Sequence, residues 1–160
     1  MKIGIDATRA ITENAGIGRV SRELIRAILK IDQEDQFEIF STHWNDSEEK
    51  SKLFASFEQK NTKLVRMNLP GNLKEWLWGT PLFTLKTEAE VLLSLSYFEA
   101  PLAQKTPEVV LIHDMATFLF PQQRGKDVSQ RHNKRVKQVC AKAVKIVTYS
   151  QSTKTDLIKI

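Results

Sequence analysis

Short runs of apolar residues alternate along the chain with longer amphipathic stretches. The clearest amphipathic stretch is 17–31, where apolar residues repeat at the spacing of one helix face. The short apolar runs are rich in Val, Ile and Leu, which is typical of buried strands. These runs predict strands at 2–6, 37–40, 62–67, 90–95, 109–113 and 145–149.

Further helices are expected between these strands. The pattern predicts them at 46–59 and 128–143, and Ser150 is a candidate N-cap of a final helix that runs to the last residue. The apolar stretch 72–85 contains Gly79-Thr80-Pro81, which predicts a helix broken at that point. Strands that alternate with helices predict the α/β class, with a Rossmann-like, doubly wound parallel sheet covered on both faces.

Composition narrows the class of protein. The chain has 160 residues, 41% of them hydrophobic, so we expect one domain with a core of its own. Its single cysteine, Cys140, excludes a disulfide framework and a cysteine-based zinc cluster. No apolar run approaches the roughly 18 residues that a membrane-spanning helix needs, and the first residues lack the apolar region of a signal peptide. We therefore expect a soluble, cytoplasmic domain.

The net charge of +5 is unevenly spread. Residues 124–145 carry eight Lys and Arg side chains against a single acid, Asp127. Such a cluster attracts phosphate groups, nucleic acid or anionic lipid, although a solvated helix face explains it equally well. Spacings of three, four and seven let Arg131, Lys134, Arg135 and Lys142 share a helix face. Together with the bulky apolar side chains of 76–83, this face predicts a peripheral contact with the inner face of a membrane.

Ligands of doubly wound sheets bind beyond the carboxyl ends of the strands, so the segments after the strands carry the candidate chemistry. After the first strand, Gly16-Ile17-Gly18-Arg19 opens a helix, and its free N–H groups favour an anion. The third glycine of the dinucleotide fingerprint is absent, because Ser21 stands at the next site. A side chain at Gly18 is expected to block an approaching phosphate.

The strand 109–113 brings an imidazole and a carboxylate, His113 and Asp114, to the same edge of the sheet. His113 is the only one of the three histidines that follows a strongly apolar strand. The alternative without a functional role is that His113 is a hydrogen-bonded structural residue. His43 and His132 lie in unrelated contexts, so the sequence predicts no metal ion.

Three segments together resemble the N-terminal domain of retaining GT-B glycosyltransferases, often called glycosyltransferase group 1 or family four. Gly-Ile-Gly-Arg-Val-Ser-Arg-Glu-Leu at 16–24 is similar to the family's glycine-rich loop and first helix. The strand that ends in His113-Asp114, with Pro121 downstream, is similar to its second block. The stretch 145–157, where a strand ends at Ser150, resembles its third block.

The resemblance implies a two-domain enzyme that transfers a sugar with retention, from a nucleotide-sugar donor to a saccharide or lipid-linked acceptor. Residues 1–160 would form the acceptor-side Rossmann-like domain, cut in its last helix, and the donor-binding domain would be absent from this chain. The 160 residues alone would then be inactive. The family does not depend on a divalent ion, so no cofactor is expected beside the nucleotide-sugar co-substrate.

The resemblance also implies roles for single residues on the donor side. Gly16, Ile17 and Gly18 would approach the donor diphosphate when the cleft closes. Arg19 and Arg9 lie close enough in the sequence to meet a phosphate or an anionic acceptor.

Near the reacting carbon, the resemblance implies that His113 hydrogen-bonds the donor sugar and that Asp114 orients the sugar or the acceptor. Ser150 matches a position near the cleft floor. Asp6, which ends the first strand, is a further candidate for the cleft.

A non-catalytic Rossmann-like module that binds a nucleotide or a nucleic acid remains an alternative. The nucleotide form would use the same strand–glycine–helix element, but Asp32 and Glu34 lie too near the helix end to hold a ribose well. The nucleic-acid form would use the basic stretch 124–145, yet no nucleic-acid-binding motif accompanies it. Nucleic acid is therefore not an expected partner.

Overall fold

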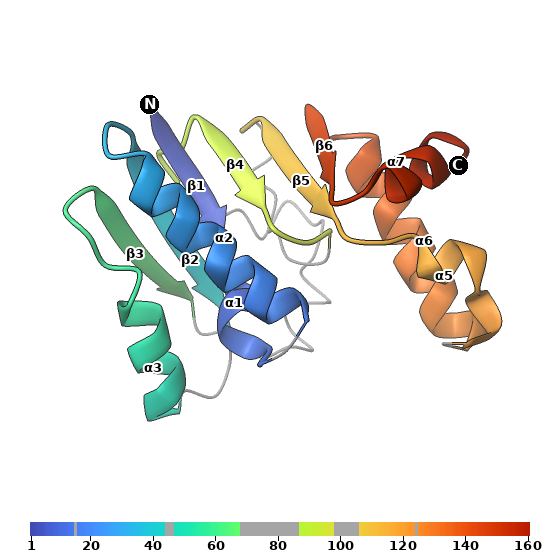
Figure 1. Ribbon diagram of the computed structural model, residues 1–160, viewed down its shortest axis with the longest axis horizontal. Helices are drawn as coiled ribbons and strands as arrows, with labels where there is room; N and C mark the ends of the chain where they lie inside the picture. The colour runs from blue at the N-terminus through green and yellow to red at the C-terminus, as the bar shows by residue number, and fades with distance from the viewer. Residues whose placement is uncertain (15, 44–46, 68–86, 98–105, 124) are drawn as a thin grey trace.

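The computed structural model describes residues 1–14, 16–43, 47–67, 87–97, 106–123 and 125–160 (Figure 1). Within these ranges six strands form one sheet: β1 (Lys2–Asp6), β2 (Gln36–Thr42), β3 (Thr62–Met67), β4 (Val91–Ser94), β5 (Glu108–Ile112) and β6 (Lys145–Thr148). The helices are α1 (Thr8–Thr12), α2 (Ile17–Ile31), α3 (Glu48–Ala55), α5 (Ala116–Leu119), α6 (Lys126–Cys140) and α7 (Gln151–Ile158), with a 3-10 turn η1 (Pro121–Gln123).

The strands lie in the order β3-β2-β1-β4-β5-β6, and every neighbouring pair is parallel. This confirms the predicted α/β class and parallel sheet, and the order is that of a Rossmann-like doubly wound sheet. The direction of winding reverses between β1 and β4, which makes their carboxyl ends the switch point where such sheets bind ligands.

The hydrophobic pattern placed most elements correctly. β1, β3 and α2 have the boundaries that the sequence predicted, whereas α3 is shorter than 46–59 and α6 ends at Cys140 instead of residue 143. The short helices α1 and α5 were not predicted, because four or five residues contain too few turns to show helical periodicity. The broken helix predicted at 72–85 lies outside the described residues.

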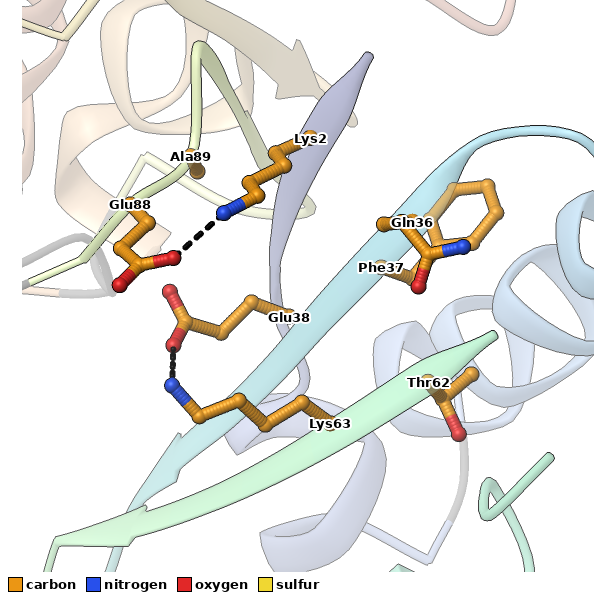
Figure 2. Close-up of a pocket in the computed structure, with 8 residues that line it drawn as sticks. All are labelled: Lys2, Gln36, Phe37, Glu38, Thr62, Lys63, Glu88 and Ala89. Carbon is orange, nitrogen blue, oxygen red and sulfur yellow. Dashed lines mark hydrogen bonds and ion pairs between the residues drawn. The ribbon is translucent and has the colours of Figure 1, made fainter. Parts of the chain in front are cut away.

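The amino-terminal edge of the sheet contains a hollow of about 220 Å³ (Figure 2). It is lined by Lys2, Gln36, Phe37, Glu38, Thr62, Lys63, Glu88 and Ala89. Its charged side chains pair with one another, Lys2 with Glu88 and Lys63 Nζ with Glu38 Oε1 at 2.9 Å. The hollow therefore lies at the edge opposite the switch point, and its charges are balanced internally.

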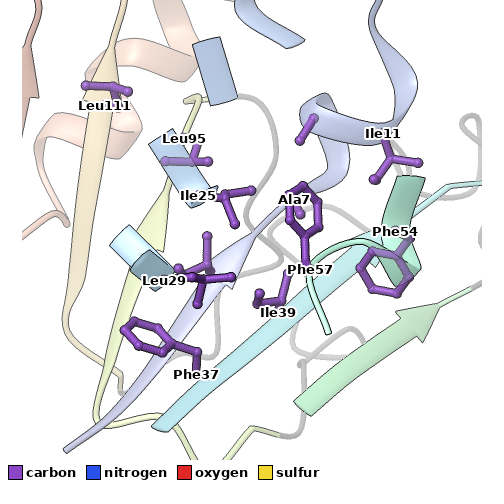
Figure 3. Close-up of a cluster of buried hydrophobic side chains, with 12 residues drawn as sticks. Ala7, Ile11, Ile25, Leu29, Phe37, Ile39, Phe54, Phe57, Leu95 and Leu111 are labelled. Atoms are coloured by element: carbon purple, nitrogen blue, oxygen red, sulfur yellow. The ribbon is translucent and has the colours of Figure 1, made fainter. Parts of the chain in front are cut away.

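The larger hydrophobic cluster lies between one face of the sheet and α1, α2 and α3 (Figure 3). Phe37 and Ile39 of β2 are at most 1% exposed there, and they meet Ile25 and Leu29 of α2. Burying a side chain of this size contributes roughly 2 kcal/mol to folding. This cluster anchors α2 to the sheet and so fixes where the helix begins.

A second cluster covers the opposite face. Val110 and Ile112 of β5 pack there against Val136 and Val139 of α6. Because side chains alternate between the faces of a strand, Leu111 between them joins the first cluster. Helices therefore flank both faces of the sheet, as the sequence predicted. Among the described helices, none is long and apolar enough to cross a membrane.

Candidate functional site at the carboxyl edge of the sheet

The segment that joins β1 to α2 begins with a buried carboxylate. Asp6 is 2% exposed, and its Oδ1 accepts a hydrogen bond from the backbone N–H of Thr8 at 2.9 Å. This bond turns the chain from β1 into α1. Asp6, predicted to line the cleft, is thus buried at the strand end and shapes the segment that follows.

The amino end of α2 is open. Gly16 is its N-cap residue, with φ of 52° and ψ of −116°, and no side chain of the described residues caps the helix. The first helical turn contains no acidic residue. Among the described residues, no acceptor is found for the N–H groups of Ile17, Gly18 and Arg19. Gly18 is buried, so the half-buried Ile17 and the exposed Arg19 offer the donors that an anion can reach at the positive end of the helix dipole.

The two glycines of this segment serve different physical needs. A Cβ atom at Gly18 would lie 2.0 Å from the carbonyl oxygen of Glu13, whereas a Cβ atom at Gly16 would meet no atom within 4 Å. Gly16 is required by its positive φ, and Gly18 by the close approach of α2 to the end of α1. A side chain at Gly18 would displace the Glu13 backbone first, which corrects the expectation that it would act chiefly by blocking a phosphate.

Arg22 fastens the same segment from the second turn of α2. Its Nη1 donates to the carbonyl oxygens of Ala10 at 2.7 Å and Glu13 at 2.6 Å, and its Nη2 donates to Asn14 at 2.9 Å. The sequence did not reveal this role, because an arginine on an amphipathic helix is typical of a solvated face. Arg22 thereby holds the backbone that leads into the open helix end.

The two candidate arginines differ in how their charge is used. Arg9 forms an ion pair with Glu13, so its charge is balanced at the end of α1. Arg19 is exposed, and no ion pair to it is found in the part of the chain that the structure describes. Arg19 is therefore the arginine that can add positive charge to the open end of α2.

His113 marks the second part of the edge. Ile112 of β5 pairs in register with Thr148 of β6, which brings the residues that follow, His113 and Tyr149, side by side. Their ring centroids lie 5.0 Å apart with a tilt of 43°. His113 Nε2 lies 2.8 Å from the carbonyl oxygen of Leu95, just after β4. The half-buried imidazole thus joins the ends of three strands.

Asp114 and Ser150 both make structural hydrogen bonds. Asp114 Oδ1 accepts from the backbone N–H of Ala116 at 2.9 Å, at the start of α5. Ser150 Oγ accepts from the N–H of Thr153 at 3.1 Å, which confirms Ser150 as the N-cap of α7. In the Ser150 segment, the side chain in contact with His113 is that of Tyr149, which the sequence did not single out.

A buried acid lies at the amino end of β5 and contacts the carboxyl end of β4. Glu108 is 3% exposed, its Oε1 accepts from Ser94 Oγ at 2.5 Å, and its Oε2 has no hydrogen-bond partner among the described residues. Burial raises the pKa of Glu108, the hydrogen bond from Ser94 opposes the rise, and the charge of Asp6 adds to it. The sequence did not reveal this group, because a single Glu at the start of a strand is usually exposed.

The predicted segments do meet at one edge of the sheet, but they contribute different groups. In the described ranges, no group of three His, Cys, Asp or Glu side chains is arranged to hold a metal ion. No family model, curated protein or solved structure matches the chain. The site is therefore defined by its own geometry: open amides and Arg19 at the start of α2, and the paired rings of His113 and Tyr149.

Proposed function

We propose that the chain is the acceptor-side domain of a retaining glycosyltransferase that takes its sugar from a nucleotide-sugar. The observation that carries this proposal is the open amino end of α2 at the carboxyl edge of the sheet, the edge that also holds His113. The N–H groups at the start of α2, for which no acceptor is found among the described residues, favour a doubly charged phosphate group together with the helix dipole and Arg19. A diphosphate is the leaving group of a nucleotide-sugar.

The proposed reaction breaks the bond between the anomeric carbon and the diphosphate oxygen. An acceptor hydroxyl forms the new bond to that carbon and gives its proton to the departing phosphate oxygen, on which negative charge develops. Preorganised N–H donors at 17–19 would stabilise this charge without requiring a metal ion. Arg22 supports that role, because it holds the segment leading into these donors.

In this proposal His113 hydrogen-bonds the donor sugar near the reacting carbon. Asp114 orients the sugar or the acceptor. Among the described residues no hydrogen bond to its Oδ2 is found, so Oδ2 can accept a hydrogen bond from a hydroxyl group. The nucleotide and most of the donor sugar would be held by a second Rossmann-like domain across a cleft. The 160 residues alone are then expected to transfer no sugar.

The basic side chains of α6 support an acceptor at a membrane surface as a further part of the proposal. Arg131 and Lys134 are exposed on α6, and each basic residue near an anionic surface contributes about 1 kcal/mol. Lys142, predicted to share their helix face, follows the end of α6 at Cys140. The apolar side chains of 76–83, predicted to take part in this contact, lie outside the described residues.

The phosphate part of the proposal can be tested on the isolated chain by titrating inorganic pyrophosphate into the ¹⁵N-labelled protein. We expect saturable shifts of the amides of 17–19 with a dissociation constant in the millimolar range, weakened further in Arg19→Gln. The capped start of α7, Gln151–Thr153, serves as an internal control and should not respond. Equal responses at both helix starts, or none at 17–19, would contradict the proposed phosphate site.

The transfer part is tested in a protein that joins this domain to a donor-binding domain. His113→Ala should lower turnover by at least about a hundredfold while leaving the thermal midpoint near that of the parent. Near-parental turnover would remove His113 from the reaction. Calorimetry of the 160-residue chain with UDP- and GDP-sugars should detect no tight binding, and a micromolar dissociation constant would contradict the division of labour between two domains.

A further inference from the structure

The hydrogen bond at His113 Nε2 determines which ring nitrogen carries the proton. The partner, the carbonyl oxygen of Leu95 at 2.8 Å, can only accept, so Nε2 must donate. A neutral imidazole has a single N–H group, and Nδ1 is therefore the unprotonated nitrogen. Among the described residues no other hydrogen bond to this ring is found, so Nδ1 keeps its acceptor capacity for a ligand.

The aromatic ring of Tyr149 packs against the same imidazole ring. Its centroid lies 5.0 Å from that of His113, in the range where aromatic rings attract each other. Its backbone is held on both sides, by Thr148 in β6 and by Ser150 at the start of α7. A ring fixed in this way opposes rotation of His113 about its Cβ–Cγ bond, which would break the hydrogen bond to Leu95.

Half of the Tyr149 side chain remains in contact with solvent, at 49% exposed. Partial burial raises the pKa of the Tyr149 phenol, so Tyr149 stays neutral through the neutral pH range. A half-exposed aromatic residue just after the edge strand contributes little to the core, and core packing alone does not account for its place beside His113.

We propose that Tyr149 is a positioning residue which, together with the Leu95 carbonyl group, holds His113 as the Nε2–H tautomer and leaves Nδ1 as the atom presented to the substrate. Neutral Nδ1 accepts a hydrogen bond and donates none. If the proposed function holds, the group that meets Nδ1 is a hydroxyl group of the sugar, which donates a hydrogen bond to the ring. In the other tautomer His113 would lose Leu95 and would present an N–H group instead.

The tautomer is directly measurable in the 160-residue chain by long-range ¹H–¹⁵N correlation of the imidazole rings at alkaline pH, where they are neutral. The chain has three histidines, and the signals of His113 are assigned by their loss in His113→Gln. We expect a protonated Nε2 and an unprotonated Nδ1 in the parent. A predominant Nδ1–H form would overturn the inference.

Two variants test the part played by Tyr149. Tyr149→Phe keeps the ring and should preserve both the tautomer and the ring-current shifts of the His113 carbon-bound protons. Tyr149→Ala should abolish those shifts and move the tautomer population towards that of a solvent-exposed histidine. His132, whose Nδ1 lies 3.2 Å from Tyr97 Oη, is the internal control and should not change. If Tyr149→Ala, folded with a parental thermal midpoint, keeps the parental imidazole signals, Tyr149 has no positioning role.

These spectra need no ligand, so they separate the inference from the proposed function. If pyrophosphate does not bind, the phosphate site is contradicted and the tautomer result is unaffected. If the tautomer is the Nδ1–H form, the inference about Tyr149 is overturned and the phosphate site is unaffected. In a protein with a donor-binding domain, Tyr149→Ala should lower kcat about tenfold with KM little changed, while Tyr149→Phe stays near the parent. Parental kcat in Tyr149→Ala would overturn the positioning role.

Discussion

The two parts of the carboxyl edge are held in place by opposite means. In the segment from β1 to α2, the side chain of Arg22 donates hydrogen bonds to three backbone carbonyl groups. The absence of a side chain at Gly18 lets α2 lie against Glu13. That arrangement leaves the backbone amides of α2 open. At the ends of β5 and β6, one carboxylate oxygen of Asp114 and the hydroxyl group of Ser150 accept hydrogen bonds from backbone amides at the starts of α5 and α7, and the rings of His113 and Tyr149 lie beside them.

The comparison shows that a polar residue at the edge of a sheet is not by itself a free functional group. Ser150 and Asp114 are the kinds of side chain that bind ligands, yet each accepts a hydrogen bond that begins a helix. Gly16 has no side chain, and the first N–H groups of the helix that it begins have no acceptor among the described residues. The groups available for chemistry are those whose donors and acceptors are not used in local hydrogen bonds.

The largest effect is expected from filling the space at Gly18. Gly18→Ala should lower the free energy of unfolding by about 3 kcal/mol, because the new Cβ would lie 2.0 Å from the Glu13 carbonyl oxygen. Gly16→Ala is the matched control, because it tests backbone strain alone, and the backbone of Gly16, with φ of 52° and ψ of −116°, should cost about 2 kcal/mol. Urea denaturation measures both. Equal losses in the two variants would mean that the contact between α1 and α2 is looser than described.

A smaller effect is expected from releasing the segment that Arg22 holds. Arg22→Met should destabilise the domain by about 2 kcal/mol, because three carbonyl groups lose a charged donor. Arg26, one turn further along α2, pairs with exposed Glu23 and, within the described ranges, with no other acid, so Arg26→Met should cost at most about 0.5 kcal/mol. Hydrogen exchange at 17–19 should rise in the first variant alone. Similar behaviour of the two variants would show that Arg22 does not organise the segment.

The smallest effect concerns Glu108, the buried acid at the start of β5, which lies close enough to Asp6 for the charge of Asp6 to raise the pKa of Glu108. Its pKa is raised in the folded state above the ordinary 4.5, so its contribution to stability is greatest below that value. The contribution falls as the pH rises through the raised pKa, because ionisation costs more in the folded chain than in the unfolded chain.

Glu108→Gln keeps an acceptor for Ser94 but carries no charge, so its stability should fall less than that of the parent as the pH rises above 4.5. Denaturation at a series of pH values measures the difference, with exposed Glu58→Gln as the control for removing one negative charge. A parental pH dependence in Glu108→Gln would mean that this carboxyl group is not desolvated.

The sequence alone was sufficient to predict the six strands and the longer helices α2, α3 and α6 in their order along the chain. It also predicted the edge of the sheet at which the candidate residues gather. Helical periodicity located α2 at Ile17–Ile31, apolar runs located the strands, and the alternation of both implied a parallel sheet. These features are local, because a buried helix face or strand must repeat along the chain. The N-cap role of Ser150 was predicted for the same reason, since its partner Thr153 lies three residues away.

What each edge residue does was decided by the tertiary structure. Tyr149 meets His113 only because β5 and β6 are paired in one register, and Glu108 meets Ser94 only because β5 lies beside β4. Arg9 is balanced by Glu13, whereas Arg19 remains exposed, although both belong to the same short segment. Contacts between residues distant in the sequence depend on strand order and register, which hydrophobic periodicity does not encode.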